Sequence, residues 1–307
     1  MVVAVLFFTG RALVRQWGAV RASMLDLHPR WGLVVLSAVL VLATYALLIQ
    51  TWRAVLGTWD ARLSFPDAAW IWNVSNLGKY VPGKVWQIGA MGMMAQRAGA
   101  SPVAAAGSAI VINLVNIIAG FAVVAVTGWR AVDAIAGGAG ASHLALAATV
   151  AALAALVAAP LILPTAARLA GRVLGRRVEV GALPARAIWI AGGGCVVAWV
   201  LYGLAFRCLA AGILGEATGA STAYVAVYTL SYLVGYLALP VPAGVGVREW
   251  ALKSSMVALG LATEPRAVLL VVASRLWLTV LEIAPGLLFL LRRAPSRPPA
   301  AIVDGTL

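Results

Sequence analysis

The stretch that decides the fold reads SNLGKYVPGKVWQ and occupies residues 75–87. It carries four polar or charged side chains, Asn76, Lys79, Lys84 and Gln87, although apolar segments flank it on both sides. Pro82 lacks a backbone N–H and Gly83 admits unusual φ angles, so the pair predicts an interrupted helix. In hydrocarbon an interrupted helix persists only where protein or water satisfies the freed backbone groups, as at the substrate sites of broken-helix transporters. This stretch is therefore the first candidate for a functional site.

The composition indicates a membrane protein. Hydrophobic residues make up 63% of the 307 residues and charged residues only 11%. The net charge of +13 arises largely from basic residues in short segments beside the apolar runs. This pattern is typical of positive-inside topology and of contact with anionic headgroups. We therefore expect a multi-pass protein of the cell (plasma) membrane whose partner is the bilayer, with no nucleic acid bound.

The apolar runs predict an all-α polytopic integral membrane fold. Uninterrupted spans are expected at residues 31–52, 102–127, 142–163, 187–214 and 265–291. A polar loop is expected at residues 53–64, and a helix on either side of Pro82 within residues 65–100.

The domain organisation is expected to be simple, with a single membrane domain at residues 1–292. Its halves are expected at about 31–165 and 187–292, with an arginine-rich cytoplasmic linker near residues 166–186. The basic tail at residues 293–307 is expected to be cytoplasmic and disordered.

A second broken stretch, PVPAGVGVREW at residues 240–250, follows an apolar helix rich in tyrosine. Each break is followed at 16 residues by another glycine and then by a proline that opens a further span. These residues are Gly83, Gly99 and Pro102 in the first half, and Gly244, Gly260 and Pro265 in the second. Matching broken helices are typical of transporters built from internal repeats. The sequence predicts a weak internal repeat and leaves open whether each break crosses the membrane or is re-entrant.

Arg275 is the charge that fits least well into an apolar span. It lies ten residues into the run that begins at Pro265, and a charge near a helix centre costs about 2.5–3.5 kcal/mol on insertion scales. Glu282 on the same helix face and Glu249 in the second broken stretch are its candidate partners. The alternative to a role in substrate binding is an ion pair that locks two helices together.

Other polar residues also have two interpretations. Lys79 and Lys84 either bind substrate or extend to the headgroups from an interfacial helix end. The i, i+3, i+4 spacing of Asn76, Lys79 and Tyr80 places these three residues on one face of a helix. Asn113 and Asn116 are secondary candidates for substrate contact, with helix–helix hydrogen bonding as the alternative.

The two broken stretches, SNLGKYVPGKVW and PVPAGVGVREW, resemble in this order the signatures of the flippase-like transmembrane family. This domain forms the N-terminal membrane part of lysylphosphatidylglycerol synthases. The resemblance implies a bundle of about eight membrane segments, some of them re-entrant, that moves a lipid between leaflets. Ala243 stands where family members often have glycine. The synthases continue into a soluble aminoacyl-transfer domain, for which 307 residues leave no room, so we expect no such enzyme activity.

The resemblance and the residue patterns together define the expected substrate site. Its residues are Asn76, Lys79, Tyr80, Pro82, Gly83, Lys84, Trp86, Gln87, Pro240, Pro242, Gly244, Gly246, Arg248, Glu249, Arg275 and Glu282. The cations and the helix N-termini at the breaks are expected to hold the phosphate of an anionic phospholipid or polyprenyl-linked glycan. Tyr80 and Trp86 are expected to line the path of the headgroup.

Two other functional classes are compatible with the sequence. One is a scaffold or regulatory subunit that partners a separate synthase. The other is a membrane transferase, which would need acidic residues as base or metal ligands, although the chain has only ten and no DxD motif. No GxxxxGK[ST] run and no clustered histidines are present, so we expect no cofactor and no metal.

Overall fold

The computed structural model describes residues 28–80, 85–128, 185–238 and 246–291, together with Ala131, Gly244 and single residues between 143 and 158. The side chains of Lys79, Tyr80, Val85 and Val103 are outside this description. The segments expected at residues 142–163, 166–186 and 293–307 fall wholly or largely outside it.

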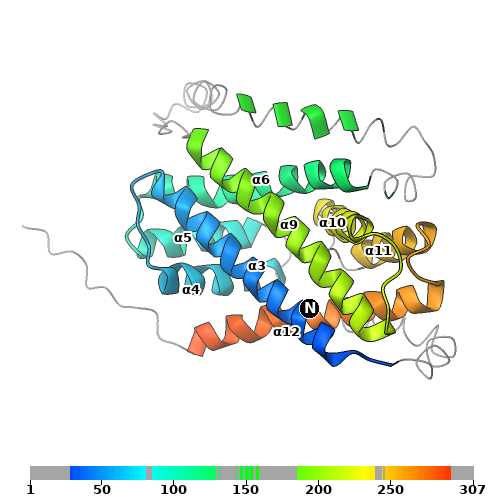
Figure 1. Ribbon diagram of the computed structural model, residues 1–307. Helices are drawn as coiled ribbons and strands as arrows, with labels where there is room; N and C mark the ends of the chain where they lie inside the picture. The colour runs from blue at the N-terminus through cyan, green and yellow to red at the C-terminus, as the bar shows by residue number, and fades with distance from the viewer. Residues whose placement is uncertain are drawn as a thin grey trace, which may run out of the picture.

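Every element in the described residues is a helix, as the sequence predicts. The elements, labelled as in Figure 1, are α3 (Trp31–Gly57), α4 (Phe65–Asn76), η1 (Leu77–Tyr80), α5 (Val85–Arg97), α6 (Pro102–Thr127), α9 (Ala185–Leu214), α10 (Ser221–Leu237), α11 (Val247–Ala258) and α12 (Glu264–Leu291).

Four of the described helices, α3, α6, α9 and α12, are long and apolar enough to cross a membrane. The other α-helices are shorter, with 12 residues in α4, 13 in α5, 17 in α10 and 12 in α11. At about 1.5 Å per residue, a 12-residue helix covers only part of the roughly 30 Å hydrocarbon layer. The prediction of a polytopic helical membrane protein is confirmed, whereas the number of crossings stays a prediction.

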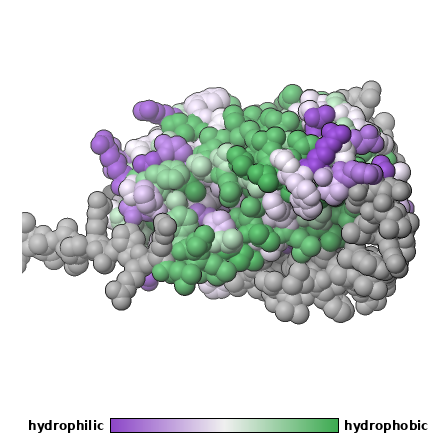
Figure 2. Space-filling view, turned by 60° about the horizontal axis from the view of Figure 1, so that its bottom comes forward, coloured by the Kyte–Doolittle hydropathy of each residue, from purple (hydrophilic) through white to green (hydrophobic). Residues whose placement is uncertain are grey.

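The outer surface fits a lipid environment. Large apolar side chains such as Val39 and Leu42 of α3 and Val280 and Leu288 of α12 are exposed. Figure 2 shows a broad hydrophobic area across one face, with hydrophilic residues gathered towards its edges. Exposed apolar residues in this arrangement are those expected to contact lipid tails.

The two long helices α3 and α9 form an antiparallel pair at the centre of the bundle (Figure 1). The Arg30 N–H at the start of α3 donates to the Gly212 carbonyl near the end of α9, at 2.8 Å. At the other end of the pair, Gly194 lies directly against Thr51 and leaves no room for a Cβ. Small residues at such contacts let membrane helices approach closely.

The remaining helices form two corresponding sets, one on each side of the α3/α9 pair. The α4/α5 pair and the α10/α11 pair lie on opposite sides of it (Figure 1). Each pair packs onto the other half, because α4 contacts α12 and α10 contacts α6. Since the corresponding helices α3 and α9 run antiparallel, we infer that the two halves are related by inverted topology.

The cap geometry of α5 and α11 gives independent support for the repeat. Gly99 has φ +98 and Gly260 has φ +66, and each follows the last turn of its helix. The N–H of Ala100 donates to the Ala95 carbonyl, and the N–H of Leu261 donates to that of Met256, which is the same Schellman pattern. Gly99 and Gly260 are 161 residues apart (260 − 99), as are Gly83 and Gly244 (244 − 83).

One boundary differs from the sequence prediction. The first long span does not end near residue 52, because α3 continues to Gly57 and includes Arg53. Arg53 is accommodated at the helix end: its Nε donates to the Leu63 carbonyl at 3.0 Å, and its guanidinium lies over the Phe65 ring at 5.8 Å. The charge therefore does not interrupt the helix, since a long side chain can reach polar groups beyond it.

The α9–α10 contact predicts a selective effect of adding one methyl group. At Gly203 of α9 a Cβ would overlap Val225 of α10, whereas at Gly193 no atom lies within 4 Å. Gly203→Ala should lower the free energy of unfolding by about 1–3 kcal/mol, the usual cost of overpacking. Gly193→Ala should be neutral or stabilising by up to ~1 kcal/mol. Equal thermal unfolding midpoints of the two variants in detergent would contradict the packing described.

Candidate functional site

The second broken stretch is shaped by two glycines. Gly244 has φ +66, and a Cβ on it would lie 2.5 Å from the Gly235 carbonyl oxygen of α10. Gly246, with φ +84 and ψ −47, precedes the first residue of α11. Only glycine enters these conformations at little cost, and only glycine permits the close backbone approach at Gly244. The sequence motif therefore fixes how α10 is followed by α11 (Figure 1).

Arg248 lies in the first turn of α11 and is buried, with an exposed fraction of 7%. Its guanidinium carbon lies 5.5 Å from the ring centre of Tyr228 and 5.3 Å from that of Tyr232, both on α10. Two aromatic faces stabilise the cation through their quadrupoles. Its buried Nη2 makes no hydrogen bond with the described residues. Arg248 therefore combines a fixed position with unused hydrogen-bonding capacity.

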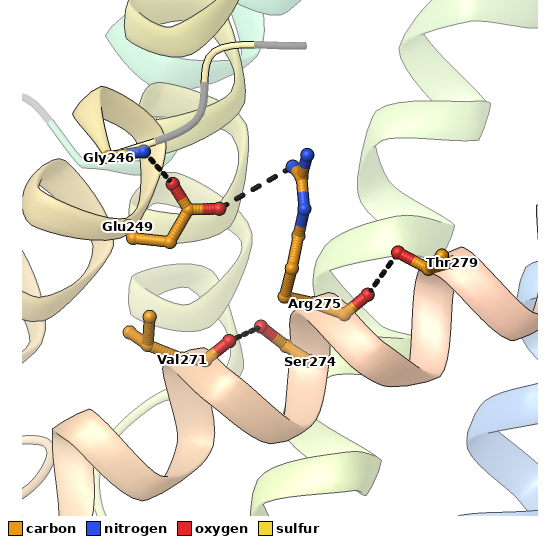
Figure 3. A network of polar contacts seen from close by, with 6 residues as sticks. All are labelled: Gly246, Glu249, Val271, Ser274, Arg275 and Thr279. Carbon is orange, nitrogen blue, oxygen red and sulfur yellow. Dashed lines mark hydrogen bonds and ion pairs between the residues drawn. The ribbon is translucent and has the colours of Figure 1, made fainter. Parts of the chain in front are cut away.

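Arg275 of α12 forms an ion pair with Glu249 of α11, with 3.4 Å between Nη1 and Oε1. The two side chains are 7% and 16% exposed, respectively. The second carboxylate oxygen, Oε2, accepts a hydrogen bond from the Gly246 N–H at 2.6 Å. Figure 3 shows Glu249 bridging these two groups, with the Arg275 guanidinium extending from α12 towards α11.

This geometry answers one question that the sequence leaves open. Of the two acids proposed for Arg275, Glu249 makes the ion pair that the structure shows. The Gly246 N–H before α11 is occupied by Glu249, because a glutamate at the third helical position can reach back to the residue before the helix. Binding of a phosphate by the N–H groups of this helix end stays a prediction.

The polar groups of α12 next to Arg275 are satisfied within their own helix. Ser274 donates to the Val271 carbonyl at 2.9 Å, and Thr279 donates to the Arg275 carbonyl at 2.7 Å (Figure 3). Both hydroxyl groups are bound to the preceding turn of their own helix, so neither turns its proton towards Glu249, the partner of the Arg275 guanidinium. Arg275 is thus directed towards α11.

An aromatic cluster adjoins the buried arginines. The rings of Tyr45 of α3 and Tyr202 of α9 are 6.1 Å apart, and Tyr202 stacks on Tyr228 at 6.0 Å. The rings of Trp199 and Tyr232 are 5.2 Å apart in an edge-to-face arrangement. Such pairs add to the burial energy of the rings and hold the tyrosine hydroxyls in place.

Glu282 of α12 faces the same interior. Its carboxylate lies near the tyrosines of the cluster and near Arg248. Arg248 and Arg275, which carry the opposite charge, also lie near Tyr232. The structure therefore brings together Arg248, Glu249, Arg275 and Glu282, the four charged residues predicted for the second half.

The sequence analysis did not single out Tyr45 and Tyr202, although both belong to this cluster. The tyrosine-rich helix at residues 224–236 was noticed, and it supplies Tyr228 and Tyr232. Tyr45 and Tyr202 each place a phenol hydroxyl inside an otherwise apolar span. A hydroxyl there is costly unless it faces other polar groups, and this is the signal that the sequence offered.

The first broken stretch is described only in part. The side chains of Lys79 and Tyr80 lie outside the described residues, as do Pro82, Gly83 and Lys84, and in the second stretch Pro240 and Pro242. The chain leaves α4 at Asn76 and tightens into the 3₁₀ helix η1. The expected α-helical face of Asn76, Lys79 and Tyr80 is therefore wrong. A 3₁₀ turn has three residues per turn, so it does not keep the i, i+4 alignment of an α-helix.

Two residues of the first stretch connect its two sides. Gln87 of α5 donates from Nε2 to the Asn76 Oδ1 at the end of α4, at 3.1 Å. Gly78 lies against the backbone of Gln87, where a Cβ would come within 3.2 Å of the nitrogen. Under the 161-residue shift Gln87 corresponds to Arg248 (248 − 87 = 161). The two broken stretches thus place a polar residue at the same point, a neutral amide in one half and a cation in the other.

The remaining candidates are less closely connected to the cations. Trp86 is 60% exposed, which suits an interfacial aromatic residue better than the expected lining of an internal path. Asn113 donates to the Ala109 carbonyl of its own helix at 2.8 Å. Asn116 takes part in a helix–helix contact through its backbone, whose carbonyl accepts from Trp199 Nε1 at 2.8 Å. Within the described residues no three His, Cys, Asp or Glu side chains are placed to hold a metal ion.

These features define a class: a polytopic helical membrane protein with broken segments at corresponding positions and charged residues buried beside one of them. The sequence model of the family described as Lysylphosphatidylglycerol synthase TM region matches residues 1–286. The chain belongs to this family, as its two signature stretches predicted, and a function related to membrane lipids follows from the membership. A comparison with curated proteins found no match.

Gly244 and Gly260 both have positive φ angles. Comparing them separates the energetic cost of a left-handed backbone from the cost of a close contact with a neighbouring helix. Both have φ +66, but only Gly244 has backbone atoms within reach of an added Cβ. Gly260→Ala should cost about 1–2 kcal/mol for the left-handed conformation alone. Gly244→Ala should cost that amount plus roughly 1–3 kcal/mol for overpacking against Gly235. The free energies of unfolding in detergent measure the difference, and equal losses would mean that the close approach is absent.

Proposed function

We propose that this protein moves an anionic lipid or lipid-linked molecule between the two leaflets of the cell membrane. The observation that carries the proposal is the burial of Arg248 and Arg275 beside the second broken stretch. A buried arginine in a membrane domain is costly, and such residues commonly mark a substrate pathway. Membership of a family of lipid-related membrane domains supports a lipid as the substrate.

Arginine suits the recognition of a phosphate diester. Its planar guanidinium carries five N–H donors and forms paired hydrogen bonds with phosphate oxygens. Arg248 keeps a buried Nη2 that bonds none of the described residues, and Arg275 presents Nη1 towards the N-terminus of α11. The tyrosine hydroxyls near both arginines would provide further contacts to glycerol or sugar hydroxyls.

The short helices would provide the path. We propose that α4/α5 and α10/α11 enter the bilayer and turn back within it, so that their broken ends lie at membrane depth. The 12-residue lengths of α4 and α11 support this arrangement. Inverted halves with broken helices are the architecture from which alternating access arises. Lys79 and Lys84 would serve the headgroup from the first half.

Transport accounts for the acids of this site better than catalysis does. Glu249 accepts a hydrogen bond from the Gly246 N–H and pairs with Arg275, so each of its two oxygens already has a partner within the protein. A general base must instead be within reach of the proton that it removes from the substrate. We therefore propose a transporter rather than a transferase, with a separate synthase as the enzyme that would supply the lipid.

The test is lipid translocation in proteoliposomes with fluorescent phosphatidylglycerol, whose quenching from outside reports the outer leaflet. Arg248→Gln and Arg275→Gln should each reduce the translocation rate by roughly tenfold or more, since a hydrogen bond to a charged group contributes about 1.5–3 kcal/mol. Arg266→Gln is the matched control, because Arg266 is on α12 as well but is exposed beside Glu216. Wild-type rates in all three variants, at equal reconstitution, would rule out the proposed role of the arginines.

A further inference from the structure

Glu249 occupies a place that is well suited to a phosphate. One of its oxygens lies on the Arg275 guanidinium, at 3.4 Å, and the other accepts the Gly246 N–H at the start of α11, at 2.6 Å. A buried arginine and a helix N-terminus are the two groups that proteins most often direct at phosphate oxygens. In this structure an acidic side chain of the protein itself lies between them (Figure 3).

The described charges beside the second broken stretch are balanced without a lipid. The cations of Arg248 and Arg275 are matched there by the carboxylates of Glu249 and Glu282. A phosphate and the Glu249 carboxylate cannot share the same donors, because two anions in contact repel each other strongly in a medium of low polarity. A phosphate can therefore bind Arg275 and the Gly246 N–H only if Glu249 gives up these contacts.

Glu249 is the carboxylate that can leave. Its side chain is 16% exposed, against 7% for Arg275, so it is the less enclosed member of the pair. Glu249 lies in the first turn of α11, which begins directly after Gly246. A Cβ added to Gly246 would meet no atom within 4 Å, so the backbone has open space at this point. Rotation of the Glu249 side chain, or a small change in the backbone angles of Gly246, would therefore free both the Arg275 guanidinium and the Gly246 N–H.

We propose that the Glu249 carboxylate is an internal substitute for the phosphate of the transported lipid. It holds Arg275 and the Gly246 N–H when no lipid is present, and it exchanges with the lipid phosphate when the headgroup arrives. This inference rests on the proposed function and extends it, because it assigns the position of the phosphate and the group that it displaces. The exchange keeps Arg275 paired throughout transport, so this buried cation is never left without a counter-charge.

The first experiment compares the thermal unfolding of wild type and Glu249→Gln in nanodiscs of phosphatidylcholine, with and without phosphatidylglycerol. The variant should be less stable than wild type in phosphatidylcholine alone, because Arg275 has lost the Glu249 carboxylate with which it forms an ion pair. Phosphatidylglycerol should bind the variant about tenfold more tightly than wild type, since the internal competitor is gone. We expect its Tm to rise by roughly 3 °C more than that of wild type when the anionic lipid is added.

Glu264→Gln is the matched control for charge removal. Glu264 also pairs with a cation, Lys253, but its side chain is 56% exposed at the start of α12. This variant should show the wild-type response to phosphatidylglycerol. Arg275→Gln/Glu249→Gln should show no added response, because the phosphate then lacks its arginine. An equal lipid response in Glu249→Gln and wild type would overturn the inference, since Glu249 would then be only a structural partner of Arg275.

A second measurement uses the wild-type protein and does not depend on the folding of a variant. A membrane-permeant carbodiimide reacts with accessible carboxyl groups, so Glu249 should be labelled severalfold faster when phosphatidylglycerol displaces it. Labelling that does not change with lipid composition would overturn the exchange. If soluble glycerol phosphate increases the labelling rate of Glu249 equally, the site between Arg275 and the Gly246 N–H binds a free phosphate and not a lipid.

The outcomes separate this inference from the proposed function. If wild type moves no lipid in proteoliposomes, the proposed function fails. If wild type moves phosphatidylglycerol, but its Glu249 shows no lipid-dependent labelling and Glu249→Gln shows no added lipid response, the function stands and the exchange fails.

Discussion

The bridge from Arg275 through the Glu249 carboxylate to the Gly246 N–H holds the charged part of the bundle together. It joins α12 to the first turn of α11 and satisfies, within one set of contacts, a buried cation, a largely enclosed anion and the N–H group that precedes α11. Loss of one partner would leave the other charged and buried, which typically costs about 3–5 kcal/mol. The bridge therefore determines where the second broken stretch sits.

The neighbouring contacts make this position possible. Gly244 lies against the backbone of Gly235, and Gly235 leaves just enough space for the Cβ of Arg248. Arg248 is consequently held against the faces of Tyr228 and Tyr232. A small residue in α10 thus determines the position of a charged residue in α11.

Much of this fold could be predicted from the sequence, because its main constraints are local. The apolar run with Pro102 at its start gives the bounds of α6. Prolines close to glycines locate both interruptions, Pro82 with Gly83 and Pro242 with Gly244. Arg275 was identifiable because a charge inside an apolar run requires a partner. The choice of Glu249 over Glu282 was not predictable, since helical periodicity places residues on a face but does not say which neighbouring helix packs there. For the same reason Tyr45 and Tyr202, 157 residues apart (202 − 45), were missed.

The central claim is that buried arginines at the second broken stretch form a seat for the phosphate of a lipid. An experimental structure in nanodiscs rich in phosphatidylglycerol tests it most directly. The account predicts phosphate density within hydrogen-bonding distance of Arg275 or Arg248, with the Glu249 carboxylate moved away from Arg275. An intact Arg275–Glu249 pair, with lipid density confined to the outer surface of the bundle, would contradict it.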